Sequence, residues 1–145
     1  HKGTSFVEIF QNCNIFNDGT FSTVTERSLR DDRILRLNHG EPLIFGKEKD
    51  KGIYLNGLKP EVVNLSNGFD KNKLIKHDQF TNESTLANLL SNFEYPDFPV
   101  PMGVIRQIKK STYEEKIDYQ IKIQTEKKGV GILSDLIRGN QVWKN

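Results

Sequence analysis

The stretch that decides the fold class is the first one, HKGTSFVEIFQNCNIFNDGTF (residues 1–21). Residues 5–11, SFVEIFQ, show little alternation between polar and apolar side chains, which is typical of a strand covered on both faces of an α/β sheet. Cys13, the only cysteine, follows at the carboxyl end of this predicted strand. Open α/β sheets bind their ligands at that end of their strands. The stretch therefore predicts an α/β fold with Cys13 at a ligand-facing edge.

Length, charge and cysteine content narrow the class of protein. The 145 residues suit one domain or a piece of a larger protein, and a net charge of +2 is too small to indicate nucleic acid or a membrane as partner. No apolar run approaches the ~20 residues of a membrane span, and no signal peptide is recognisable. One cysteine excludes an internal disulfide, so we expect a cytoplasmic protein. Because the sequence starts inside a strand and without Met, we expect a fragment of a longer chain.

The clearest local structure is a β-hairpin over residues 41–57, EPLIFGKEKDKGIYLNG. Its two β-rich runs, LIF and IYL, flank a charged turn. Residues 60–65 predict a third strand. Charges of alternating sign over residues 47–51 indicate a solvated hairpin tip rather than a nucleic-acid patch.

Helices are predicted on both sides of a polar segment, residues 67–83, which marks a sub-boundary. Ser84 begins an amphipathic helix that ends at Phe93, and Thr112 begins a longer one that ends at Gly129. The shorter predicted elements are a helix at 22–30, a strand or an extended helix end at 33–37, a strand at 104–108, a helix at 131–139 and a strand at 141–143. Residues 95–103 hold three prolines, so we expect extended chain draped over a partner surface.

Cys13 is the leading candidate for chemistry. A free cysteine is usually a small buried apolar residue. The position after a strand and the polar neighbours Gln11, Asn12 and Asn14 weaken that interpretation, so a ligand role stays open beside it. An iron–sulfur cluster needs four ligands, so three others would have to come from outside this sequence.

The other candidate residues show no pattern of a catalytic or metal-binding site, so we expect them to have ordinary structural or surface roles. His1, His39 and His77 are dispersed and lack the close spacing of metal motifs. Gly129 and Gly131 lack the complete phosphate-binding patterns and indicate a helix end and a turn. No pair of carboxylates is evident among Glu8, Asp18, Asp31, Asp32 and Asp50. Glu8 is unusual because it lies within the apolar strand, where it would form a buried pair or face a partner subunit.

Three stretches together carry a resemblance to a known family: HKGTSFVEIFQNCNIFN (residues 1–17), PLIFGKEKDKGIYLNG (residues 42–57) and FPVPMGVIR (residues 98–106). They resemble the thiamine-pyrophosphate-binding beta subunit of 2-oxoacid:ferredoxin oxidoreductases, most of all the 2-oxoglutarate type. The resemblance covers the C-terminal half of such a subunit and is weakest over residues 109–145. It implies that residues 1–18 are the last strand and edge of the thiamine-diphosphate-binding α/β domain, and that residues 19–145 are a C-terminal extension with the hairpin and two to four helices.

The resemblance also implies a chemistry. Enzymes of this family oxidatively decarboxylate a 2-oxoacid, transfer the acyl group to coenzyme A, and pass electrons through [4Fe–4S] to ferredoxin. Their G-D-G-type motif for thiamine pyrophosphate and Mg²⁺ lies upstream and is absent from this sequence. The fourth cluster cysteine of the family lies in the segment that matches FQNCN, which implies that Cys13 is a metal ligand and that amides among Gln11, Asn12 and Asn14 donate hydrogen bonds to the cluster sulfurs. The expected partners are the alpha subunit, ferredoxin, coenzyme A and the 2-oxoacid, and no catalytic residue is expected here.

Two further expectations follow. A fragment of this kind would be inactive alone and would leave Phe6, Ile9 and Phe10 partly uncovered. The alternative hypothesis is a non-catalytic protein-interaction module in which Cys13 is a structural core residue.

Overall fold

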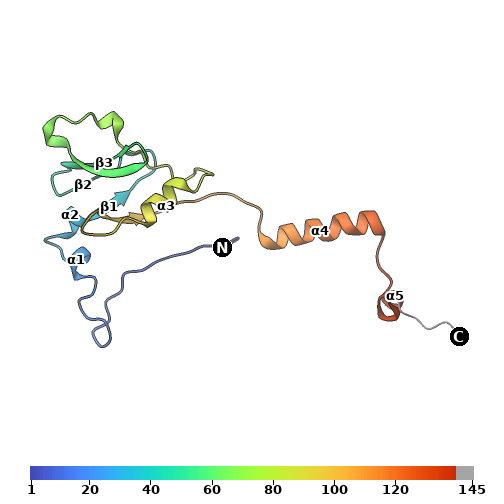
Figure 1. Ribbon diagram of the computed structural model, residues 1–145. Helices are drawn as coiled ribbons and strands as arrows, with labels where there is room; N and C mark the ends of the chain where they lie inside the picture. The colour runs from blue at the N-terminus through green and yellow to red at the C-terminus, as the bar shows by residue number, and fades with distance from the viewer. Residues whose placement is uncertain (140–145) are drawn as a thin grey trace. The chain divides into compact units, whose positions relative to one another are not determined.

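The computed structural model describes residues 1–139 (Figure 1). The chain divides into two compact units. One consists of residues 8–108, and the other consists of residues 1–7 and the chain from Lys109 onward. Each unit is described by itself.

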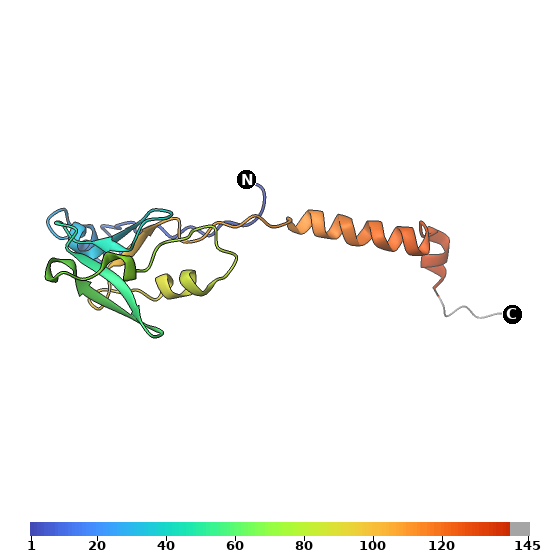
Figure 2. The same ribbon diagram turned by 90° about the horizontal axis from the view of Figure 1, so that it is seen from above.

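The unit of residues 8–108 contains two small sheets. In the first, β1 (Ile34–Leu37) pairs in parallel with β5 (Val100–Gly103), and Ile34 lies opposite Val100. The second is antiparallel in the order β2-β3-β4, with β2 at Ile44–Phe45, β3 at Lys51–Asn56 and β4 at Lys59–Asn64. The helices and strands, with one parallel pair, confirm the predicted α/β class. Figure 2 shows the tip of the β3–β4 hairpin projecting from this unit.

One apolar core joins the two sheets. β1 alternates between exposed and buried side chains, and its inward residues Leu35 and Leu37 pack with residues of the hairpin and of α3 (Thr85–Ser91). The buried residues of this core are Leu35, Leu37, Leu43, Phe45, Ile53, Leu90 and Phe93. Leu86 and Leu89 are half-buried against it, which confirms the apolar stripe predicted for residues 84–93.

The hairpin and the third strand confirm the prediction from local sequence. A Cβ atom at Gly52 on β3 would lie 2.7 Å from Leu74 Cδ2, so a larger residue there would force the Leu74 side chain to move. The polar segment of residues 67–83 contains the 3₁₀ turn η2 (Lys71–Lys73) and follows η1 (Leu65–Asn67). The strand alternative for residues 33–37 is correct.

Residues 5–11 do not pair as the predicted strand with any part of the described chain. These residues have no backbone hydrogen bonds to a neighbouring strand, and Phe6 and Ile9 are 90% and 75% exposed. The expected exposure of this segment is thereby confirmed, although Phe10 is half-buried and stacks on Phe21 at 4.8 Å between ring centroids.

Three other predictions are wrong in whole or in part. Residues 98–103 were expected to lie on a partner surface, but they pack within the unit of residues 8–108. Phe98 stacks on Phe93, and β5 pairs with β1. Residues 104–108 form no strand; instead Gln107 N–H donates to the Gln79 carbonyl at 2.6 Å. The helix predicted at 22–30 is broken into two single turns, α1 (Ser22–Thr25) and α2 (Arg30–Arg33), since Glu26 adopts an extended conformation.

The second unit carries two helices, α4 (Tyr113–Lys128) and α5 (Leu133–Arg138). Thr112 caps α4 through a capping box, in which Glu115 N–H donates to Thr112 Oγ1 and Thr112 N–H donates to the Glu115 carboxylate. With α3 they make three helices longer than one turn within residues 1–139, in the expected range of two to four. The strand predicted at residues 141–143 lies outside the described residues. Within residues 1–139, no helix has the length and apolar character needed to cross a membrane.

Candidate functional site

Cys13 lies in an exposed loop and not in the core. Residues 14–16 form a turn that brings the chain back toward the cysteine, and Asn17 N–H donates to the Cys13 carbonyl oxygen at 2.9 Å. The thiol is therefore open to a ligand or to a neighbouring chain. This exposure contradicts the alternative of a structural core cysteine.

The side chain of Asn12 closes this loop. Its Nδ2 atom donates to Asn14 Oδ1 at 2.8 Å and to Asp18 Oδ1 at 2.9 Å, and its Oδ1 atom accepts from Gly19 N–H at 2.9 Å. Thr20 adds a hydrogen bond from its hydroxyl to Asn17 Oδ1. One amide thus ties together both ends of the segment that holds the thiol.

Backbone N–H groups of the turn stabilise the thiolate form of Cys13. The N–H of Phe16 contributes most to lowering the pKa of the thiol, followed by that of Ile15; loss of solvation acts in the opposite direction, and the N–H of Asn17 adds a smaller lowering. Metal ligation requires the thiolate, and hydrogen bonds from peptide N–H groups are a usual way to orient and tune it. The loop is therefore suited to hold one anionic sulfur ligand.

A single thiolate does not make a complete metal site. Among residues 1–139, no group of three or more His, Cys, Asp or Glu side chains could hold an ion together. The described residues thus offer one exposed sulfur atom and no complete metal site. Asn12 is committed to the loop, so of the three amides next to Cys13 in sequence only those of Gln11 and Asn14 retain nitrogens without a partner among the described residues.

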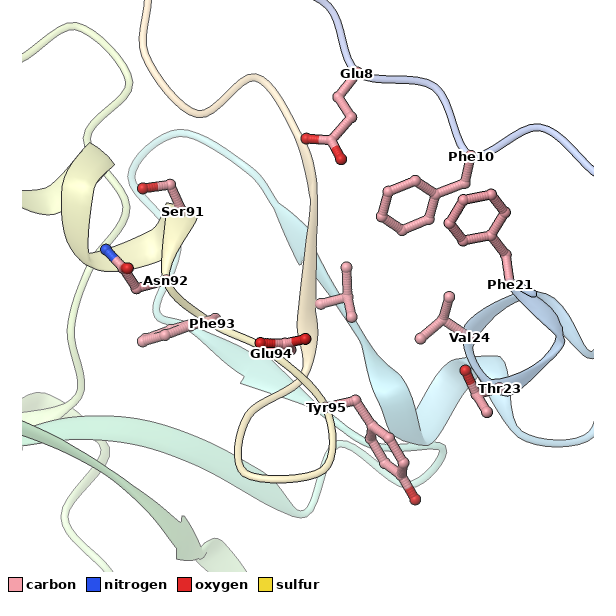
Figure 3. Close-up of a pocket in the computed structure, with 11 residues that line it drawn as sticks. Glu8, Phe10, Phe21, Thr23, Val24, Ser91, Asn92, Phe93, Glu94 and Tyr95 are labelled. Carbon is pink, nitrogen blue, oxygen red and sulfur yellow. The ribbon is translucent and has the colours of Figure 1, made fainter. Parts of the chain in front are cut away.

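A pocket of about 420 Å³ lies beside this loop in the same unit (Figure 3). Stacked Phe10 and Phe21 form one wall, with rings inclined by only 4°, and Val24 lies below them. Glu8 lines the pocket and has no ion-pair partner within the described part of the chain, so the buried pair considered for it is not formed. Glu94 lines the opposite side.

The three histidines have separate surroundings in the structure. His77 is buried, its Nε2 atom lies 2.9 Å from the Val104 carbonyl oxygen, and its Nδ1 atom has no partner among the described residues. His39 is exposed beside Asp78, and the His1 side chain is hydrogen-bonded to the Ser5 hydroxyl. The structure does not bring the three together.

The remaining candidates also take structural roles. Asp32 accepts from Lys51 Nζ at 3.1 Å, and this hydrogen bond is the main reason that the pKa of its carboxyl is lowered. Gly129 ends α4 with a φ of 77°, which confirms the predicted helix end. Sequence reasoning missed the loop-closing role of Asn12, although the N-C-N…N-D-G spacing of short polar residues before a glycine is a signal for such a turn.

Comparison with known proteins gives one informative relative. No protein-family model matches the chain, and no solved structure gives a significant match. The chain is 27% identical, over 99% of its length, to the 2-oxoglutarate oxidoreductase subunit KorB of Mycobacterium tuberculosis, and it spans 39% of that relative. This similarity confirms the resemblance to the beta subunits of 2-oxoacid oxidoreductases that the sequence motifs carry.

Proposed function

We propose that this chain is part of the beta subunit of a 2-oxoglutarate:ferredoxin oxidoreductase and supplies one ligand of its [4Fe–4S] cluster. The observation that carries the proposal is the exposed Cys13 thiol, whose pKa is lowered by three backbone N–H groups of its own loop. The similarity to KorB over almost the whole chain supports the same assignment.

Within the proposal, the loop prepares a sulfur ligand. The N–H groups of Phe16, Ile15 and Asn17 favour the thiolate, and Asn12 keeps the turn closed around it. The bound cluster would accept and release single electrons, and hydrogen bonds to its sulfur ligands would adjust its potential. Three further thiolates would come from other parts of the subunit.

The proposed reaction is the oxidative decarboxylation of a 2-oxoacid to an acyl-coenzyme A, with the electrons passed to ferredoxin. Thiamine pyrophosphate and Mg²⁺ would be bound by parts of the subunit that this sequence does not include, since it lacks a G-D-G motif. The alpha subunit and ferredoxin would be its protein partners, and we place the complex in the cytoplasm. This chain alone would have no activity.

The test is replacement of Cys13 by Ser in the complete subunit, produced together with the alpha subunit. We expect the loss of one cluster, or about four iron atoms, with a matching fall in visible absorbance and in 2-oxoglutarate-dependent ferredoxin reduction. Ile15→Ser is the matched control, because Ile15 is 83% exposed two residues away and has no ligand atom in its side chain. Unchanged iron and activity in the Cys13 variant would instead support the non-catalytic interaction module.

A further inference from the structure

We infer that His77 is an acid-sensitive latch: its neutral imidazole holds residues 104–108 against the loop of residues 77–82, and protonation of the ring releases them. The inference is independent of the proposed function, because it concerns contacts within the unit of residues 8–108.

The imidazole of His77 is covered by atoms of this chain itself. The residue is 1% exposed, and its backbone is fixed on both sides. His77 N–H donates to the Glu41 carbonyl oxygen at 2.9 Å, and Gly40 N–H donates to the His77 carbonyl oxygen at 2.7 Å. The ring therefore cannot reach solvent unless the segments around it move.

The closed arrangement admits only the neutral ring. Nε2 lies 2.9 Å from the Val104 carbonyl oxygen, which can only accept, so Nε2 carries the hydrogen atom. Nδ1 is buried and has no hydrogen-bond partner among the described residues. A second proton there would place a positive charge in the interior without an acceptor, which is strongly unfavourable.

No charged side chain of the described chain bonds to the ring and could compensate its protonation. The segments bonded to His77 carry the following ionisable residues: His39, Glu41, Lys76, Asp78 and Arg106. Glu41 accepts from Asn38 Nδ2 at 2.9 Å, and Lys76 is exposed. Asp78 Oδ1 lies 3.5 Å from His39 Nδ1, and the Arg106 guanidinium donates to backbone carbonyl oxygens.

The latch acts on residues 104–108, which follow β5 and form no strand. Besides the bond from His77 to Val104, this segment is held by Gln107 N–H, which donates to the Gln79 carbonyl oxygen at 2.6 Å. In an open state, without these bonds, the ring is in water, where an imidazole takes up its second proton near about pH 6.5. The latch is therefore intact well above this pH and is lost as the pH falls below it.

The experiment measures hydrogen exchange in the complete subunit at pH 7.5 and 5.5, corrected for the intrinsic pH dependence of exchange. Protonation of an exposed imidazole increases the open population about tenfold over this interval. We expect the amides of residues 104–108 to exchange faster by this factor at pH 5.5. The amides of β3 should keep their protection, because the opening is local.

Two histidine variants assign the effect. His77→Gln keeps a side-chain N–H for the Val104 carbonyl but cannot be protonated, so its exchange should not respond to pH. His39→Gln is the matched control and should respond like the wild type, because the His39 side chain is 48% exposed.

An equal response to pH in His77→Gln and the wild type would overturn the inference. So would a loss of protection in β3 as large as that in residues 104–108, which would indicate unfolding of the whole unit. If His77→Gln does not fold, the wild type still decides, because equal protection of residues 104–108 at both pH values would also overturn the latch.

Discussion

The Asn12 side chain donates to the Asp18 carboxylate at 2.9 Å and so fixes the two ends of the loop that presents Cys13. The same amide also bonds to Asn14 and accepts from Gly19 N–H. The geometry around the thiol therefore depends on one exposed side chain and not on packing.

The first prediction concerns the ionisation of Cys13. Because the backbone N–H groups favour the thiolate, its pKa is lowered, and the thiol should react at lower pH in the folded chain than in the unfolded one. The measurement is the rate of alkylation by iodoacetamide as a function of pH, in buffer and in concentrated urea, on metal-free protein. Superimposable pH profiles would show that the loop has no such effect.

The second prediction links Asn12 to that ionisation. Asn12→Ala removes the three hydrogen bonds that hold the turn, so the N–H groups lose their alignment and the pKa of Cys13 should rise toward its ordinary value. The alkylation profile would then move to higher pH. Gln11→Ala is the control, because no described hydrogen bond involves its side chain. A shift of equal size in both variants would count against the special role of Asn12.

The parts of the structure that could be predicted from sequence are those set by neighbours along the chain. The hairpin of residues 41–57 and the Thr112 cap depend on local pattern, and both were predicted correctly. The parallel pairing of β1 with β5 joins residues that are 66 positions apart, such as Ile34 and Val100. Proline content alone predicted extended chain over residues 95–103 but could not predict this pairing. A strand at residues 5–11 lacks a pairing partner among the described residues.

The same distinction applies to the candidate site. Cys13 could be singled out because it is the only thiol and follows an apolar stretch. Its hydrogen bonds could not be derived, since the positions of the Phe16 and Ile15 N–H groups depend on backbone angles of the turn. The burial of His77 could likewise not be predicted from the sequence, because its partner Val104 lies 27 residues away.

The third prediction concerns His77. Its imidazole is 1% exposed, and it lies 2.9 Å from the Val104 carbonyl oxygen, which accepts from Nε2–H. His77→Ala would leave a cavity and a buried carbonyl without a donor, and we expect the free energy of unfolding to fall by about 2–4 kcal/mol. Urea unfolding measures this loss. His39→Ala, at an exposed histidine, should change it by less than about 0.5 kcal/mol.

The fourth prediction follows from the pKa of Asp32. The hydrogen bond from Lys51 lowers this pKa in the folded state, so the carboxylate stabilises the fold above the unfolded pKa of about 3.9. That stabilisation is lost as pH falls through the still lower folded pKa. Asp32→Asn should therefore lower the urea midpoint at pH 7, and its difference from the wild type should shrink below about pH 4. A difference that is independent of pH would exclude the charge as its cause.

The last prediction contrasts two leucines of the same unit. Leu90 on α3 is fully buried in the core that joins the two sheets, whereas Leu58 at the hairpin tip is 96% exposed. Leu90→Ala should cost about 2–5 kcal/mol, since it removes buried methyl groups and leaves a cavity. Leu58→Ala should leave the stability of the chain nearly unchanged, because almost the whole side chain is already exposed. If the Leu58 variant were equally destabilised, the hairpin tip would have to pack against another part of this chain, and the core would extend further than residues 35–93.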